Sequence, residues 1–175
     1  MTNLTSTQQA KPVRQSQVTM TEMVLPQHTN ALGSVFGGTI MSWVDIAAAI
    51  CAMRHCARQV VTASVDALHF LAPVKLGWIV TIQASVNFVG GTSCEIGVKI
   101  NSENPITGEA YHTASAYLTF VALDSHGRPT AVPSLILETD EERHRHAAAE
   151  IRRANRLKLK SELKARREHQ GQGMA

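Results

Sequence analysis

Between residues 60 and 122 the chain repeatedly alternates apolar and polar side chains, and this pattern constrains the fold more than any other feature. The alternation is clearest in residues 80–88 and 94–100, and one apolar face continues through residues 114–122. A period of two places successive side chains on opposite faces of a strand. One face of each strand is therefore expected to be buried and the other to face solvent or a partner, which is typical of antiparallel sheets.

One helical segment precedes these strands. The expected order is strand, helix and four further strands: residues 16–24, 39–56, 60–71, 80–88, 94–100 and 114–122. Trp43, Ala47 and Ile50 stand at helical spacing within the second segment. The sequence therefore predicts an α+β fold, in which one long helix packs against a five-stranded antiparallel sheet. Because such a sheet leaves edges open, we also expect a dimer.

The two ends of the chain differ from this central domain, which we place at residues 16–133. Residues 1–15 are rich in polar side chains and are expected to be disordered. Residues 134–175 are predicted to form a basic helical tail, because a capping box at Thr139–Glu142 precedes good helix formers. Its apolar stripe is thin: Ala147, Ile151, Ala154, Leu159 and Leu163. The domain is therefore expected to fold without the residues after Leu137.

Composition excludes several classes of protein. The 175 residues, 44% of them hydrophobic, suffice for one well-buried domain. The net charge of +3 comes from the tail, so the domain itself is not expected to bind nucleic acid. No apolar run approaches the ~20 residues of a membrane span, and the beginning of the sequence is polar, so a cytoplasmic protein is expected. The three cysteines form no metal-binding pattern and are expected to be reduced and buried.

The strongest motif runs from Asn30 to Asp45. Gly37 and Gly38 open the predicted helix, where unpaired N–H groups and the positive end of the helix dipole favour a developing oxyanion. About two turns later Asp45 stands in an otherwise apolar stretch, so its carboxylate must be paired, solvated or functional. Spacing alone leaves a second interpretation open, in which the glycines form a plain turn and Asp45 lies on the solvent-exposed face.

This motif resembles that of the hotdog acyl-CoA thioesterases of the cytosolic acyl-CoA hydrolase type. The resemblance covers residues 18–123 and includes two further blocks, Ser64-Val65-Asp66-x-x-x-Phe70-x-x-Pro73-Val74 and Gly91-Thr92-Ser93, in the same order. It implies a hotdog fold assembled as a hexamer, a trimer of dimers. It also implies that Asp45 and Asn30 are a catalytic pair contributed from opposite sides of a dimer interface, with Gly37 and Gly38 as oxyanion donors.

The resemblance also implies that the CoA moiety passes near Ser64 and the Gly91-Thr92-Ser93 turn. From the sequence alone this turn could equally be an ordinary hairpin. Other chemistries lack their motifs: there is no G-x-S-x-G nucleophile elbow, no phosphate-binding G-x-x-x-x-G-K-[ST], and no histidine pair at metal-site spacing. We therefore expect no metal and no bound cofactor.

The sequence thus predicts an enzyme that hydrolyses acyl-CoA to free CoA and a carboxylic acid. Asp45 would act as a general base for water or as a nucleophile, and the sequence does not separate the two. One alternative is a hotdog dehydratase, although Asp45 stands where that chemistry would use a histidine. The other is a non-catalytic acyl-CoA-binding regulator with a nucleic-acid-binding tail, although the tail lacks the aromatic residues and helix-turn-helix pattern of such proteins.

Overall fold

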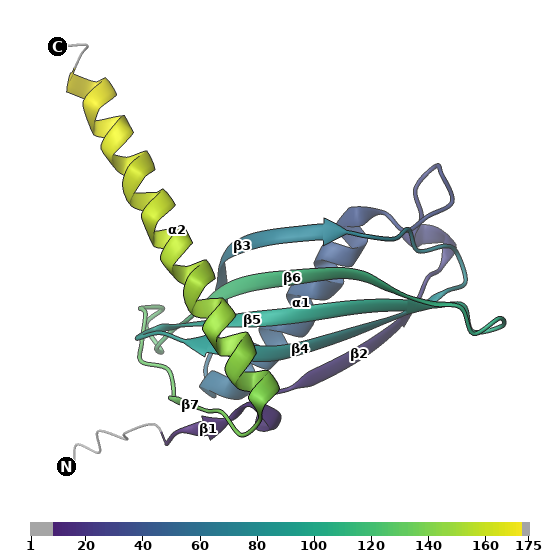
Figure 1. Ribbon diagram of the computed structural model, residues 1–175, viewed down its shortest axis with the longest axis horizontal. Coiled ribbons are helices and arrows are strands. Elements are labelled where there is room, and N and C mark those ends of the chain that lie inside the picture. The colour runs from purple at the N-terminus through teal and green to yellow at the C-terminus, as the bar shows by residue number, and fades with distance from the viewer. Residues whose placement is uncertain (1–8, 173–175) are drawn as a thin grey trace.

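The computed structural model describes residues 9–172 (Figure 1). Its elements follow in the order β1 (Lys11–Pro12), η1 (Val13–Gln15), β2 (Val18–Met23), η2 (Pro26–His28), α1 (Gly37–Cys56), β3 (Val60–Phe70), β4 (Ile79–Val89), β5 (Ser93–Glu103), β6 (Ala110–Ala122), β7 (Leu135–Ile136) and α2 (Asp140–Gln172). Neither helix in this part of the chain has the length and apolar character needed to cross a bilayer.

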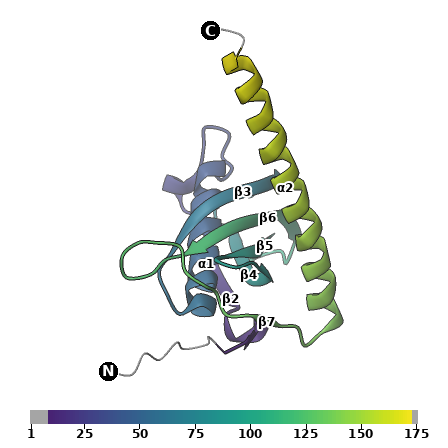
Figure 2. The ribbon, with the colours of Figure 1, turned by 90° about the vertical axis from the view of Figure 1, so that its left-hand side faces the viewer.

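Five strands form one antiparallel sheet in the order β2-β4-β5-β6-β3. The sheet curves around α1, and α2 crosses the opposite face before extending beyond the domain (Figures 1 and 2). Alternate residues of the central strands point to α1 and are fully buried, as the period-two pattern requires: Val80, Ile82, Ile96, Ile100, Leu118 and Phe120. The predicted α+β hotdog architecture, with one long helix and five antiparallel strands, is confirmed.

Helix α1 packs closely from its middle onward because the face that meets the sheet there is built from small side chains. Ala47, Ala48, Cys51 and Ala52 are fully buried against the strands. The helix ends at Ala57, which has a left-handed backbone conformation (φ 50°). The Lys11 side chain supports that end by donating to the carbonyl oxygens of Arg54 (2.6 Å) and His55 (3.2 Å).

The three cysteines lie in this core and are unpaired and buried, as predicted: Cys51, Cys56 and Cys94. Burial raises the pKa of the Cys51 thiol to about 12. Cys51 therefore stays protonated at neutral pH and behaves as a small apolar side chain.

The predicted disorder of residues 1–15 is wrong for the last part of that segment. Lys11–Pro12 pair in parallel with Leu135–Ile136, and Val13 is fully buried. The pairing joins segments more than a hundred residues apart in the chain, so local composition gave no indication of it. Residues 1–8 lie outside the described part of the chain.

Helix α2 begins with the predicted capping box. The Thr139 hydroxyl accepts a hydrogen bond from the Glu142 N–H (3.2 Å), and the Glu142 carboxylate accepts one from the Thr139 N–H (3.1 Å). The thin apolar stripe of the helix does not face the sheet, because Ala147, Ile151 and Ala154 are exposed.

The contact face of α2 is instead mostly charged, with Ala149 fully buried beside it. Arg152 donates two hydrogen bonds to the Glu95 carboxylate, at 3.1 and 2.6 Å, and Glu95 is only 1% exposed. Arg156 pairs with Asp66 of β3 and also reaches Glu95 (3.4 Å). Burial raises the pKa of Asp66, and the charge of Arg156 opposes that rise. A partly buried ion network therefore holds α2 to β5 and β3.

Candidate active site

Asp45 of α1 meets the edge strand β3. Its Oδ1 atom accepts a hydrogen bond of 2.8 Å from the Thr62 hydroxyl, and its other carboxylate oxygen has no partner among residues 9–172. The structure therefore orients one oxygen of the carboxylate and leaves the other available. Thr62 is a functional candidate that sequence reasoning missed, because a threonine in a strand gives no indication of which helix residue it will contact.

Gly37 and Gly38 form the first two positions of α1, as predicted from the motif. Their N–H groups donate no hydrogen bond within the described chain, and no side chain caps this end of the helix. A Cβ on Gly38 would lie 2.4 Å from the Phe36 ring, so a side chain at this position would displace that exposed ring. Two free N–H groups at the positive end of a helix suit a developing negative charge on oxygen.

Asn30 lies in the loop before α1 and holds that loop in shape. Its Oδ1 atom accepts hydrogen bonds from the Leu32 N–H (2.9 Å) and from the Ser34 hydroxyl (3.3 Å). These contacts fix the amide orientation with the carbonyl oxygen turned to the loop. The side-chain NH₂ group has no partner in the part of the chain that the structure describes, so it is available to donate to a substrate carbonyl.

One chain does not bring all of these groups together. Gly37 and Asp45 are eight residues apart in a continuous helix, so about 12 Å of helix axis separates them. Attack on a carbonyl needs the nucleophile and the oxyanion donors within about 3–3.5 Å of the reacting atoms. A site that uses both groups would therefore have to combine the amino-terminal end of one α1 with Asp45 in the middle of another.

The surroundings of these groups are apolar and exposed. Several exposed hydrophobic side chains lie on the loop before α1, on α1, and on β3 or directly after it: Leu32, Phe36, Met41, Ile46, Val61, Val65, Phe70 and Leu71. Because β3 ends the sheet, its outer edge also has unpaired backbone groups. A second copy of the chain placed here would cover the apolar surface and bring two sets of site residues together.

A small apolar pocket of about 340 Å³ opens beside the glycine turn. Gly37, Ile40, Phe70 and Val74 contribute to its walls. The pocket could take a hydrocarbon chain next to the free N–H groups. The described residues contain no group of three or more His, Cys, Asp or Glu side chains that could hold a metal ion.

The residues predicted to lie near CoA are at the Asp45 end of β3. Ser64 is two residues from Thr62 on this strand, and the Gly91-Thr92-Ser93 turn joins β4 to β5. Ser93 pairs with Val121, which pairs with Val61, so the turn is about 10 Å from the Thr62 region across two strand spacings. A bulge between Thr62 and Ser64 pairs Ser64 with Thr119, which pairs with Glu95 on the α2 face, so the Ser64 side chain faces away from Asp45. Asn30 and the two glycines lie at the amino-terminal end of α1, about two turns before Asp45.

Comparisons with known proteins all indicate one family. Residues 32–109 match the model of the thioesterase superfamily. A Bacillus subtilis protein named as an uncharacterised acyl-CoA thioester hydrolase is 43% identical over 145 residues, which cover 83% of this chain and 84% of that protein. The rat cytosolic acyl coenzyme A thioester hydrolase is 36% identical over 135 residues, covering 76% of this chain but 35% of the longer rat protein.

Solved structures agree in fold and in sequence. An acyl-CoA hydrolase from Staphylococcus aureus, in complex with butyryl coenzyme A, coenzyme A and coenzyme A disulfide, superposes with a TM-score of 0.85 at 38% identity over 93% of this chain and 99% of that one. A hexameric acyl-CoA thioesterase gives 0.84 at 38% identity, over 86% and 97%. Variants of the Staphylococcus aureus enzyme carry alanine for an Asn, an Asp or a Thr, and these positions have the same spacing as Asn30, Asp45 and Thr62.

Proposed function

The chain belongs to the thioesterase superfamily, and we propose that it is an acyl-CoA thioester hydrolase that cleaves acyl-CoA into free CoA and a carboxylic acid. The observation that carries the proposal is the hydrogen bond from Thr62 to one oxygen of the Asp45 carboxylate, which leaves the other oxygen without a partner among the described residues. Relatives of the chain are named for this reaction. The reaction needs a base or nucleophile and an oxyanion stabiliser, and the protein's own groups supply both. The proposal involves no metal or cofactor.

Each site in this proposal lies between two copies of the chain. Asn30, Gly37 and Gly38 of one copy hold the thioester oxygen, and Asp45 with Thr62 comes from the other. This division is supported by the helical rise, which puts about 12 Å of helix axis between Gly37 and Asp45 of one chain. Ser64 and Gly91-Thr92-Ser93 contact the CoA moiety near the Asp45 end of the sheet. The dimers assemble further into a trimer of dimers, consistent with the hexameric relative.

Two routes satisfy the chemistry. In the first, Asp45 removes a proton from water, the hydroxide attacks the thioester carbon, and the collapsing oxyanion expels CoA thiolate, which takes the proton back from Asp45. In the second, the Asp45 carboxylate attacks the same carbon, releases CoA thiolate and forms a mixed anhydride that water then hydrolyses. In both routes, negative charge on the carbonyl oxygen is stabilised by the N–H donors at the start of α1.

The direct test is release of free thiol from acyl-CoA by the purified protein. Turnover with a saturated acyl-CoA supports hydrolysis. Hydration of a 2-enoyl thioester without thiol release would support the dehydratase alternative, and binding without any turnover would support the regulator. A cytosolic location belongs to the proposal, since the rat relative is named as a cytosolic acyl coenzyme A thioester hydrolase.

Mixing two inactive variants tests the division of the site between chains. We expect Asn30→Ala and Asp45→Ala homo-oligomers to be inactive, because every site in each lacks one group. Co-expressed mixed dimers should recover up to about half of the wild-type turnover, since one of the two sites then has both native residues. Differently tagged copies allow purification of the mixed form. Absence of activity in verified mixed dimers would show that both residues serve one site from the same chain.

Replacing Thr62 tests whether its hydroxyl orients the carboxylate. Thr62→Val keeps the shape but removes the donor to Asp45, and a hydrogen bond to a charged group contributes about 1.5–3 kcal/mol. We expect kcat to fall about tenfold with little change in thermal stability, because Thr62 is exposed in the single chain. Thr62→Ser, which retains the hydroxyl, is the matched control. Equal kcat values for the Val and Ser variants would contradict this role.

A further inference from the structure

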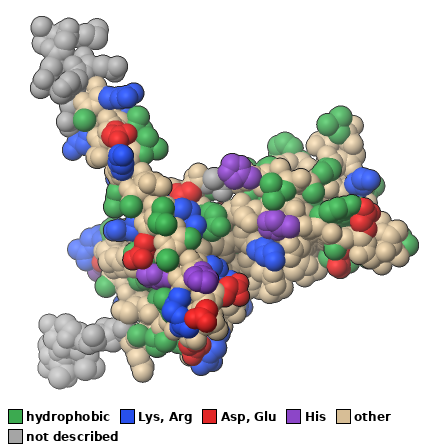
Figure 3. Space-filling view, viewed as in Figure 1, with side chains coloured by type: hydrophobic (Ala, Val, Ile, Leu, Met, Phe, Trp, Pro, Cys, Tyr) green, Lys and Arg blue, Asp and Glu red, His purple; other side chains and the backbone are tan. Residues whose placement is uncertain are grey.

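Helix α2 is longer than the sheet on which it lies. Arg152 pairs with Glu95 of β5, and Arg156 pairs with Asp66 of the edge strand β3. Residues 157–172 continue the helix past that edge, and hydrophobic and charged side chains cover the projecting part (Figures 1, 2 and 3). At 1.5 Å per residue this part spans about 24 Å, which equals about five strand spacings. The helix therefore reaches over the place where further strands would continue the sheet.

We propose that residues 157–165 of α2 are a contact surface for a second copy of the chain. They pack on the outer face of that copy's β3 and β6, where the outer face is the face of the sheet on which α2 lies. The inference rests on the dimer proposed above at the edge of β3. It extends that dimer to the face of the sheet opposite to Asp45.

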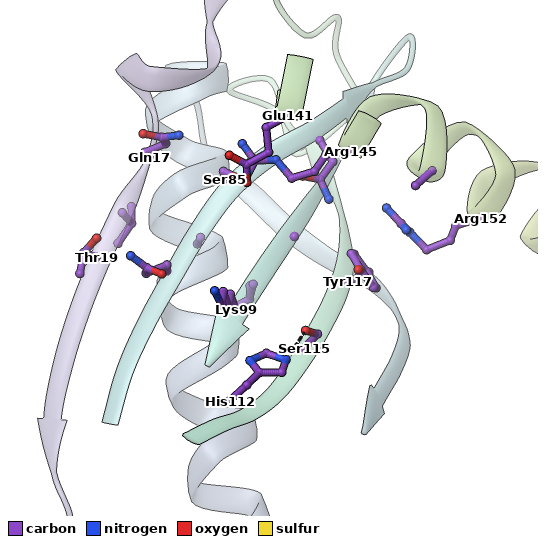
Figure 4. Close-up of a pocket in the computed structure, with 17 residues that line it drawn as sticks. Gln17, Thr19, Ser85, Lys99, His112, Ser115, Tyr117, Glu141, Arg145 and Arg152 are labelled. Carbon is purple, nitrogen blue, oxygen red and sulfur yellow. Dashed lines mark hydrogen bonds and ion pairs between the residues drawn. The ribbon is translucent and has the colours of Figure 1, made fainter. Parts of the chain in front are cut away.

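The side of α2 that meets the sheet continues into the projecting part. Arg152 points from α2 toward Tyr117 of β6 and lies 3.7 Å over its ring (Figure 4). Leu159 stands seven residues after Arg152, and Leu163 four residues after that, so both lie on the side of the helix that Arg152 marks. Their side chains are 57% and 47% exposed. The projecting part therefore turns two exposed leucines toward the space beyond β3.

The edge of β3 identifies the second copy as the occupant of that space. This edge has unpaired backbone groups, and a second copy that joins it around a two-fold axis places its own β3 beside this one, followed by its β6. Leu159 and Leu163 lie about 5 and 10 Å along the helix from Arg156, which corresponds to one and two strand spacings. They would therefore lie over β3 and β6 of the second copy. By symmetry, each copy both gives and receives this contact.

The charges of the projecting part are consistent with a contact on this side alone. Lys158 precedes Leu159 and Lys164 follows Leu163, so each lysine points about 100° away from its neighbouring leucine and keeps its ammonium group in water. Arg166 returns to the leucine side and ends its apolar part, which limits the contact to residues 157–165. An anionic lipid surface would attract the lysines, but it would not explain why the leucines face the same side as Arg152.

Photo-crosslinking tests the contact directly. Leu163 is replaced by the photoreactive amino acid p-benzoylphenylalanine in the full-length protein, and isotope-labelled and unlabelled chains are mixed so that mass spectrometry identifies peptides joined between copies. Leu157, which is 52% exposed on another side of the same helix, is replaced in the same way as the matched control. Position 163 should crosslink to β3 or β6 of the other copy, and position 157 should not. Crosslinks that stay within one chain, or equal yields from the two positions, would overturn the proposal.

Charged substitutions test whether the contact contributes to assembly. Leu159→Glu combined with Leu163→Glu removes four leucines from each dimer, so the dissociation constant measured by sedimentation should rise about 100-fold or more. Leu157→Glu should leave it unchanged, and circular dichroism checks that both proteins keep α2. Equal dissociation constants for the two proteins would also contradict the proposal.

The same measurements separate this contact from the rest of the proposed assembly. A monomeric wild type would refute the site shared between two copies together with this contact. An oligomeric wild type without crosslinks from position 163 would refute this contact alone, whatever its rate of thiol release. Cosedimentation of the wild type with phosphatidylglycerol vesicles, lost in the double Leu→Glu variant and without crosslinks between copies, would assign the leucines to a lipid surface instead.

Discussion

Asp45→Asn should lower kcat by about 10²–10⁴-fold and leave the fold and acyl-CoA binding nearly intact. The amide keeps the size of the carboxylate, and its carbonyl oxygen can still accept the 2.8 Å hydrogen bond from Thr62. It can neither take a proton from water nor attack the thioester, and general acid–base catalysis alone contributes about 10²–10⁴-fold. KM should change little, because the contacts to CoA are equal in the ground and transition states.

Steady-state thiol release with the purified variant measures this effect, and circular dichroism establishes that the variant is folded. Asp140→Asn is the matched control, because Asp140 is an exposed aspartate at the start of the other helix. Its turnover should equal that of the wild type. If Asp45→Asn retained turnover within a few-fold of the wild type, Asp45 would be an ordinary exposed helix residue and the catalytic assignment would be lost.

The sequence predicted the fold from a pattern that depends on short-range geometry. Alternation along residues 80–88 and 94–100 reports which side chains enter the core, and Ile82 and Ile96 are indeed fully buried. The helix beginning at the glycine pair was predicted for the same reason, since the helical spacing of Trp43, Ala47 and Ile50 is a local property. The motif also drew attention to Asp45, because a carboxylate in an apolar stretch demands an explanation. Its catalytic role stays a prediction.

What the sequence did not predict depends on contacts between distant segments. Thr62 is seventeen residues from Asp45, and only the packing of β3 on α1 shows that they meet. The thin apolar stripe of α2 gave no indication that the helix docks on the sheet, whereas Arg152 and Arg156 make the contacts through charge. Sequence rules treat arginines on a helix as solvated unless a buried carboxylate such as Glu95 is known to lie opposite.

The second prediction with a large expected effect concerns the stability that the ion network beneath α2 provides. Arg152→Leu should destabilise the protein by about 3–5 kcal/mol, because it leaves the 1%-exposed Glu95 carboxylate with only the 3.4 Å contact to Arg156. A loss of that size lowers the melting temperature by roughly 10 °C in a chain of this length. Arg166→Leu, on the exposed far part of α2, is the matched control and should change the melting temperature little.

A second substitution separates charge burial from loss of packing. Glu95→Gln in the Arg152→Leu background removes the buried negative charge, so it should recover most of the lost stability, whereas lost packing over Tyr117 would not be recovered.

Deleting the residues after Leu137 differs from both substitutions. Without α2, Glu95 is exposed to water, so its charge is no longer buried without a partner. The prediction that the domain folds without its tail is therefore compatible with a large loss of stability in Arg152→Leu. Thermal unfolding of the single and double variants decides the matter: an Arg152→Leu protein as stable as the wild type would show that the network contributes nothing to holding α2 on the sheet.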